Sequence, residues 1–218
     1  MDRQEMAPNS QISSGYTGAP LPPRRETRVL EPMPKKPTLV DFFNLRFQEQ
    51  AQHVLQSAAR AMRQGLPEET VFACLLHDTG MAIQMADHGY VAAAMYEPYV
   101  PEEVSWAIRY HQSLRFFADP VVGYEYPTMY FDLFGRDFVP EPYIQRDAEY
   151  AKKHPWYMKA RLVTLNDEYS FDTSVKLALD PFIEIIGRNF KQPAEGLGWD
   201  NSPSSYMWRT IINPSRPL

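Results

Sequence analysis

The chain has 218 residues, a formal net charge of −5 at pH 7 and one cysteine. Its length suits a single domain with appendages, and its acidic balance lacks the basic excess that binding to nucleic-acid phosphates requires. The single cysteine, Cys74, excludes an internal disulfide, and no apolar run approaches the ~20 residues of a membrane span. We therefore expect a cytoplasmic protein without a nucleic-acid or membrane partner.

The first 38 residues differ in composition from the rest of the chain. They hold seven of the twenty prolines and show almost no helical periodicity. Such a segment buries too little apolar surface to offset the entropy of ordering it. We expect residues 1–38 to form a disordered or loosely docked N-terminal arm, residues 39–192 to form the folded domain, and residues 193–218 to form a tail that wraps around it.

Amphipathic patterns separated by short turns predict helices after the arm. Apolar residues recur near a period of 3.6 from Phe43 to Met62, and Gly65 ends that pattern. Pro101 followed by two glutamates is typical of a helix start. The predicted helices cover residues 41–64, 67–78, 88–97, 101–117, 155–170 and 173–190. Residues 121–150 read as an ordered, aromatic-rich connection, and no segment reads as a strand, so the expected fold class is all-α.

Four of the five histidines fall on the inward faces of these helices. They are His53, His77, His88 and His111. Any one of them is typical of a core histidine with a satisfied hydrogen bond, but four that face inward beside Asp78 favour a metal site, because buried polar groups are costly unless they are paired or bind a cation. Imidazole and carboxylate donors without thiolates suit iron, manganese, cobalt or zinc. The fifth, His154, lies among basic residues and is expected at the surface.

Several segments resemble the HD-domain superfamily of metal-dependent α-helical proteins. The pair His77-Asp78 follows a helical histidine by 24 residues and precedes two more histidines. The segment "HVLQSA" at residues 53–58 resembles the H-x-x-Q-[ST]-A element of the mixed-valent diiron oxygenases, which include myo-inositol oxygenase and the PhnZ-type phosphonate oxygenases. The segment "RLVTLNDEYS" resembles the element that carries their final aspartate, which is Asp167 here. The resemblance covers roughly residues 40–172.

The resemblance implies an HD-domain helical bundle with a dinuclear metal site in its core. It implies that His53, His77, Asp78 and Asp167 bind one iron, and that Asp78, His88 and His111 bind the other. Asp78 would bridge the two, and Asp78, His88 and His111 would carry the catalysis. The cofactor would be a mixed-valent Fe(II)/Fe(III) pair, with manganese, zinc or nickel as alternatives. The activity would be oxidation or C–C or C–P cleavage of a small polar molecule with O2.

Three departures from the family pattern bear on the substrate. Met81 stands where many members have a lysine, and Phe43 and Arg46 stand where the phosphonate enzymes have a tyrosine and a glutamate. Arg115 lies one helical turn after His111, where the phosphonate enzymes have a lysine. We expect Arg115 to bind an anionic substrate, the alternative being a solvated helix residue. Gln56, one turn after His53, is placed to orient a ligand histidine.

Two other functions stay open at this point. Two-metal HD phosphohydrolases use a closely similar donor set to activate water. A catalytically idle HD domain that serves as a binding module is disfavoured, because all six ligand positions are filled. The segment "HVLQSA" and the missing lysine at position 81 favour the oxygenase.

Overall fold

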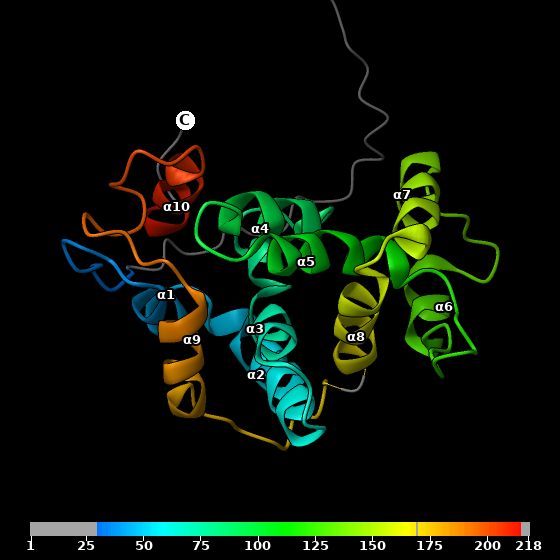
Figure 1. Cartoon of the computed structure of the whole chain (residues 1–218). Helices are drawn as coiled ribbons and strands as arrows, with labels where there is room; N and C mark the ends of the chain where they lie inside the picture. Colours follow the sequence, from blue (N-terminus) through cyan, green and yellow to red (C-terminus); the bar gives the residue numbers. More distant parts are fainter. Residues whose placement is uncertain (1–29, 169, 215–218) are drawn as a thin grey trace, which may run out of the picture. The chain divides into compact units, whose positions relative to one another are not determined.

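The computed structural model describes residues 30–168 and 170–214. The chain divides into two units, residues 1–30 and 31–218, and the helices of the described residues all belong to the second (Figure 1). Residues 1–29 of the expected N-terminal arm lie outside the described residues. The division of the chain at residues 38 and 192 therefore stays a prediction.

The second unit is all-helical, as expected. Within the described residues no strand is present, only an isolated bridge between Asp119 and Tyr124. The elements in chain order are α1 (Leu39–Leu45), α2 (Gln48–Arg63), α3 (Glu68–Leu76), the 3-10 turn η1 (Thr79–Ala82), α4 (His88–Tyr96), α5 (Glu102–Leu114), α6 (Thr128–Phe134), α7 (Pro142–Lys153), α8 (Tyr157–Asp167), the 3-10 turn η2 (Asp180–Phe182), α9 (Ile183–Asn189) and α10 (Ser205–Ile212). None of these helices is long and apolar enough to cross a membrane.

The centre of the unit is α3. Every residue from Thr70 to Leu76 is buried, which explains why this helix is apolar on all sides. It packs against α2, α5, α8 and α9, and Figure 1 shows it standing between α9 and α8. The C-terminal end of α3 is therefore surrounded by other helices, and His77 and Asp78 follow directly at that end.

The helix expected over residues 41–64 is two helices. Thr38 and Asp41 form a capping box that starts α1, and the chain leaves helical geometry at Arg46 and Phe47 before α2 begins. Phe47 is fully buried and contacts Trp208 of α10, at 6.5 Å between ring centroids. The Phe47 ring thus packs against a distant segment of the chain. Met62, expected on the buried face of α2, is 39% exposed.

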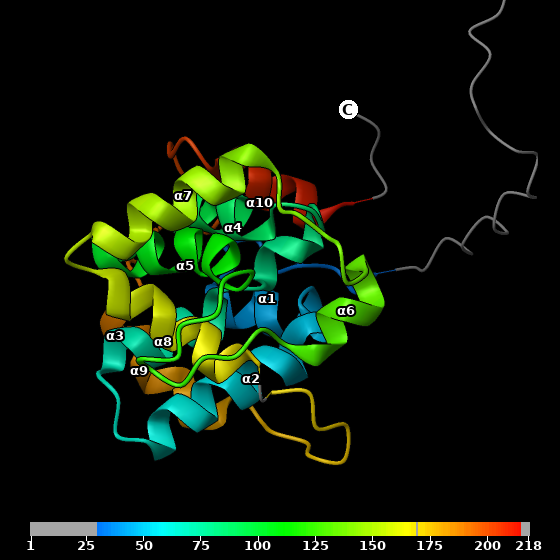
Figure 2. The ribbon, with the colours of Figure 1, turned by 90° about the vertical axis from the view of Figure 1, so that its right-hand side faces the viewer.

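A buried arginine joins α8 to the end of α5. The Nη1 and Nη2 atoms of Arg161 donate to the carbonyl oxygens of Leu114 and Phe117, both at 3.2 Å. Its Nε atom donates to the Tyr157 hydroxyl at 2.9 Å. Backbone carbonyls thus satisfy a fully buried guanidinium, and they fix α8 against the end of α5 that carries His111. Figure 2 shows α7 lying along α5 on the outer side.

Two other sequence-based assignments are wrong. The connection over residues 121–150 contains α6 and most of α7, and Pro142 at the start of α7 is a helix-start signal within it. The helix expected over residues 173–190 is reduced to η2 and α9. The residues before η2 are attached to α2 instead, since the amide of Gln52 hydrogen-bonds both backbone groups of Leu177, each at 2.9 Å.

Two glycines bring η1 and α5 close to α4. A Cβ atom at Gly80 would lie 2.4 Å from the carbonyl oxygen of His88, and one at Gly89 would lie 2.9 Å from the Cβ of Gln112. Asp87 precedes α4 in a left-handed conformation, and its side chain makes no capping hydrogen bond to the helix. Its Oδ1 atom accepts instead from Gln112 and from the Tyr143 hydroxyl.

Candidate metal centre

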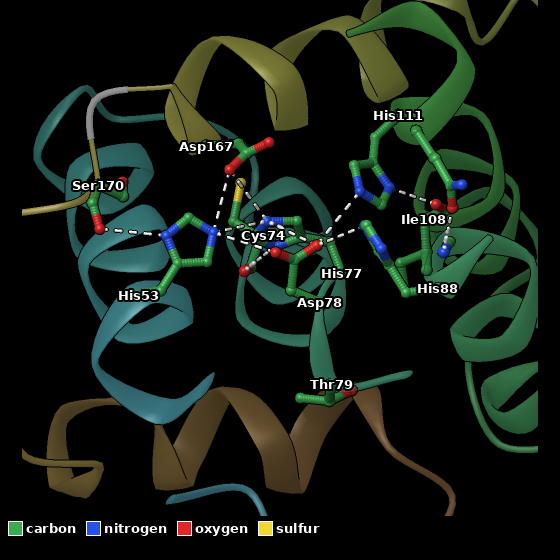
Figure 3. Close-up of polar contacts among 12 residues, drawn as sticks. His53, Cys74, His77, Asp78, Thr79, His88, Ile108, His111, Asp167 and Ser170 are labelled. Atoms are coloured by element: carbon green, nitrogen blue, oxygen red, sulfur yellow. Dashed lines mark hydrogen bonds and ion pairs between the residues drawn. The ribbon is translucent and has the colours of Figure 1, made fainter. Parts of the chain in front are cut away.

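Five elements bring six predicted ligands together (Figure 3). His53 comes from α2, His77 and Asp78 follow the end of α3, His88 opens α4, His111 lies in the last turn of α5, and Asp167 ends α8. In Figure 3 the four imidazoles surround Asp78, with Asp167 above it. His77 and His111 are fully buried, and His88, Asp78 and Asp167 are each less than 9% exposed.

The first group of donors surrounds the Nε2 atom of His53. This nitrogen lies 3.0 Å from Oδ1 of Asp167, 3.3 Å from Oδ2 of Asp78 and 3.3 Å from Nε2 of His77. The Nε2 atom of His77 lies 3.6 Å from Oδ1 of Asp167 and 3.5 Å from Oδ1 of Asp78. One donor atom from each of these four residues thus converges on one point.

The second group shares Asp78 with the first. Its Oδ1 atom lies 3.0 Å from Nε2 of His88 and 3.5 Å from Nε2 of His111. The donor atoms within each group all lie within 4.8 Å of one another, so each group could hold a metal ion. A carboxylate common to both groups has the position of a bridging ligand.

All four imidazoles are bonded to backbone carbonyls through Nδ1. His77, His88 and His111 each contact the carbonyl oxygen three residues earlier, in Cys74, Met85 and Ile108 respectively. A carbonyl only accepts, so Nδ1 carries the proton in each ring and, in a neutral ring, the Nε2 lone pair faces the centre. His53 is oriented in the same way, but by the carbonyl oxygen of Ser170, at 3.1 Å.

This donor set fits a metal ion. Among the described residues, Asp78 Oδ1, His88 Nε2 and His111 Nε2 are buried and have no hydrogen-bond partner. Lone pairs therefore face one another across 3.0–3.5 Å, an arrangement that only a proton or a cation stabilises. Nitrogen and oxygen donors without a thiolate suit iron, manganese, cobalt, nickel or zinc.

The charges of the two aspartates govern protonation in the first group. Burial disfavours the charged imidazolium, but hydrogen bonds to Asp167 and Asp78 outweigh it and raise the pKa of His53 to about 10. Burial also disfavours the charged carboxylate of Asp78, yet the neighbouring histidines hold its pKa well below the usual range. Burial lowers the pKa of His111 to about 4. Without metal, protons thus neutralise the first group, and a metal ion must displace them.

We expect metal to change the pH dependence of stability. In the metal-free protein the raised pKa of His53 contributes stability that is fully present below pH 6.5 and is lost as the pH rises towards about 10. The Tm of EDTA-treated protein should therefore fall between pH 6.5 and 9. With excess Zn²⁺ or Mn²⁺ the fall should be absent, because loss of protons favours metal binding. Calorimetry of the wild type and His53→Gln checks this; an equal fall in metal-free His53→Gln would contradict it.

Arg115 follows His111 by one helical turn and has no carboxylate partner among the described residues. It follows α5 directly, and among the described residues no acidic group lies within ion-pair distance of its guanidinium. Its Nε atom is shielded from solvent and has no hydrogen-bond partner in the described part of the chain. The guanidinium carbon lies 4.8 Å from the ring centroid of Phe116 and 5.5 Å from that of Tyr130. Arg115 is thus half-buried against aromatic rings and is not a freely solvated helix residue.

Tyr130 connects this arginine with the carboxylates. Burial is the main cause of its raised pKa, and the charges of Asp167 and Asp78 raise it further while Arg115 lowers it. The phenol is buried and comes from α6, in the segment expected to be an ordered connection without a helix. The Tyr130 phenol thus lies within electrostatic reach of Arg115 and of both aspartates.

The remaining candidates lie apart from the cluster. The ring of His154 stacks on Trp106 at 4.4 Å between centroids, and His154 belongs to neither donor group. Within the described part of the chain the Gln56 amide makes no hydrogen bond to an imidazole; it hydrogen-bonds the backbone of Asp172. The Ser170 carbonyl that orients His53 was missed, because a backbone group leaves no signal in the sequence.

Residues 50–131 match the family model of the HD domain. The match includes five of the six clustered donors as well as Arg115, and Asp167 lies beyond its end. HD domains are typically metal-dependent enzymes, either hydrolases or oxygenases. No curated protein matches the chain. Residues 50–131 are therefore similar to an HD domain, and the chain carries a His/Asp cluster that could hold a metal ion.

Proposed function

We propose that the protein is a non-haem diiron oxygenase that uses O2 to oxidise or cleave a small polar, anionic molecule. The observation that carries the proposal is the pair of donor groups that share Asp78, built from imidazoles and carboxylates alone. The resemblance of residues 53–58 to the diiron oxygenase element supports iron as the metal. When bound, a mixed-valent iron pair supplies O2 activation.

The side chains of this chain would divide the work around the metals. His53, His77, Asp78 and Asp167 would bind one iron, and Asp78, His88 and His111 the other, with the second group carrying the catalysis. Each histidine is fixed through Nδ1, so its Nε2 atom needs no reorientation to bind metal.

Arg115 would bind the anionic end of the substrate. Its guanidinium has no carboxylate partner among the described residues, and it follows His111 by one helical turn. A guanidinium presents two parallel donors to a carboxylate, phosphonate or sulfonate. Half-burial against Phe116 and Tyr130 reduces the competition from water. The substrate class proposed is therefore a small organic anion.

The same donor set supports one alternative, a divalent-metal-dependent phosphohydrolase. Two metals that share a carboxylate can activate water as well as O2. Met81 weighs against it, because many HD hydrolases have a lysine at that position.

Metal analysis and O2 consumption test the proposal. The protein purified from aerobic culture should contain two irons per chain and show the electron paramagnetic resonance signal of an Fe(II)/Fe(III) pair. It should consume O2 with at least one member of a panel of phosphonates, sulfonates and hydroxy acids. Zinc, manganese or nickel together with turnover of a phosphate ester would overturn the oxygenase and favour the phosphohydrolase.

We expect Arg115→Ala to weaken substrate binding and leave the metal in place. A charge-assisted hydrogen bond is worth about 1.5–3 kcal/mol, so KM should rise about tenfold to a hundredfold. The iron content should be unchanged, because Arg115 contributes no donor atom to either group. Arg109→Ala is the matched control, since Arg109 lies on the same helix and also packs on aromatic rings. Loss of iron in Arg115→Ala, or an equal rise of KM in Arg109→Ala, would contradict the assignment.

A further inference from the structure

His53 differs from the other three histidines in what orients it. His77, His88 and His111 each donate to a carbonyl three residues earlier, so their own segments fix them. The partner of His53 is the carbonyl oxygen of Ser170, which lies 117 residues later in the chain. The orientation of His53 therefore depends on a segment that must itself be held in place.

That segment, residues 170–177, runs beside α2, and we call it the strap. Figure 1 shows it in gold on the way from α8 to α9. The amide of Gln56 hydrogen-bonds both backbone groups of Asp172: Nε2 donates to the carbonyl at 2.8 Å, and Oε1 accepts from the N–H at 3.0 Å. Gln52 bonds both backbone groups of Leu177 in the same way. Two glutamines of one helix thus attach the strap at two points.

The strap also covers the ring of His53. Phe171 stacks on it, with 4.3 Å between ring centroids and 17° between ring planes, and is itself 52% exposed. Ser170 and Phe171 therefore make both contacts of the strap with His53, and Gln56 holds the residue that follows directly. Gln56 is buried and follows His53 by three positions on α2, so one helix carries both the ligand and the group that fixes the ligand's partner.

We propose that Gln56 is a positioning residue of the metal centre, which fixes the Ser170 carbonyl and the Phe171 ring on His53 by binding the backbone of Asp172. A carbonyl bonded to Nδ1 sets the tautomer and the ring orientation of a ligand imidazole. Without the Gln56 amide, the carbonyl and the phenyl ring lose their nearest attachment to α2. The proposal rests on the metal centre, and it holds for either an oxygenase or a hydrolase.

The two donor groups should respond differently to loss of Gln56. Only the first group contains His53, whereas His88 and His111 are oriented by Met85 and Ile108. Gln56→Ala should therefore weaken one of the two metal-binding events and spare the other. Outer-shell partners of ligand histidines typically contribute a factor of 10–100 in metal affinity.

Titration of the metal-free full chain with Co²⁺, followed by calorimetry and visible absorption, tests the proposal. Gln56→Ala should weaken one binding event about 10- to 100-fold and alter its absorption spectrum. Gln52→Ala, which removes the same kind of hydrogen bonds five residues further along the strap, should change neither event by more than about threefold. Gln56→Met, which keeps the side-chain length, replaces Gln56→Ala if that variant does not fold.

A double-mutant cycle with His53 separates positioning from a general effect on the fold. His53→Ala should weaken the same binding event, and adding Gln56→Ala to it should cause no further loss, because the ring to be oriented is absent. Additive losses, equal effects of Gln52→Ala and Gln56→Ala, or unchanged affinity in Gln56→Ala would overturn the proposal. A wild type that binds no Co²⁺ would instead overturn the metal centre itself.

Discussion

Replacement of Asp78 by alanine should remove both metal ions and abolish turnover. Asp78 belongs to both donor groups, so the substitution reduces the first group to His53, His77 and Asp167 and the second to His88 and His111. The second group then has no carboxylate and the first keeps only that of Asp167, so both have less negative charge to compensate a divalent cation. Each site loaded at a hundred times its Kd contributes about 2.7 kcal/mol to stability, and this contribution should disappear.

Asp167→Ala and Asp147→Asn provide the comparison. Asp167 belongs to the first group only, so its loss should remove one metal and leave the second. Asp147 is a half-buried carboxylate of α7 outside both groups, and its substitution should leave the metal content unchanged. Metal per chain and Tm with and without EDTA measure all three. Retention of two metals in Asp78→Ala would refute the shared ligand.

The grouping of four histidines around Asp78 could be predicted from the sequence because its signals are local. His77 and Asp78 end the most apolar segment of the sequence, and the histidines at 53, 88 and 111 fall on predicted helices. Helical periodicity fixes which face of each helix is inward, and inward side chains of packed helices meet in the core. The patterns therefore predicted that the four histidines and Asp78 face inward together, whereas Asp167 was identified only through the family resemblance.

Features that depend on contacts between distant segments were not predictable in this way. Phe47, at the break between α1 and α2, packs against the distant Trp208, and Leu177, in the segment expected to be helical, is bonded by the Gln52 amide. Neither position carries a glycine or proline signal. By contrast, Pro142 and the lysines at the end of α7 were a readable signal that the surrounding aromatic residues obscured.

The contacts that orient His53 also join distant segments, so the sequence did not predict them. Gln56 was recognisable as a residue one turn after a ligand, and a direct contact with an imidazole was the natural expectation. The structure instead places Asp172, Ser170 and Phe171 between them. Two of these contacts use backbone atoms, which every residue type supplies, so no sequence pattern could specify them.

The close approach of η1 to α4 predicts a severe effect of Gly80→Ala. The new Cβ would lie 2.4 Å from the carbonyl oxygen of His88 and 2.8 Å from the backbone nitrogen of Ala92. These are backbone atoms that cannot rotate away, so α4 must move off η1. Overpacking of this kind costs about 1–3 kcal/mol, and here it also separates the segment that carries Asp78 from the helix that begins with His88.

Replacement of Gly80 by alanine should have a different effect from replacement of a helical glycine that has free space around it. At Gly187 in α9 a Cβ meets nothing within 4 Å, so Gly187→Ala should stabilise the protein by about 0.5–1 kcal/mol. Urea unfolding should therefore move in opposite directions for the two variants. Gly80→Ala should in addition weaken metal binding at the second group, because His88 moves relative to Asp78 while the first group stays in place. A Gly80→Ala protein with wild-type stability and two metals would show that α4 and η1 are not packed as closely as the Cβ distances require.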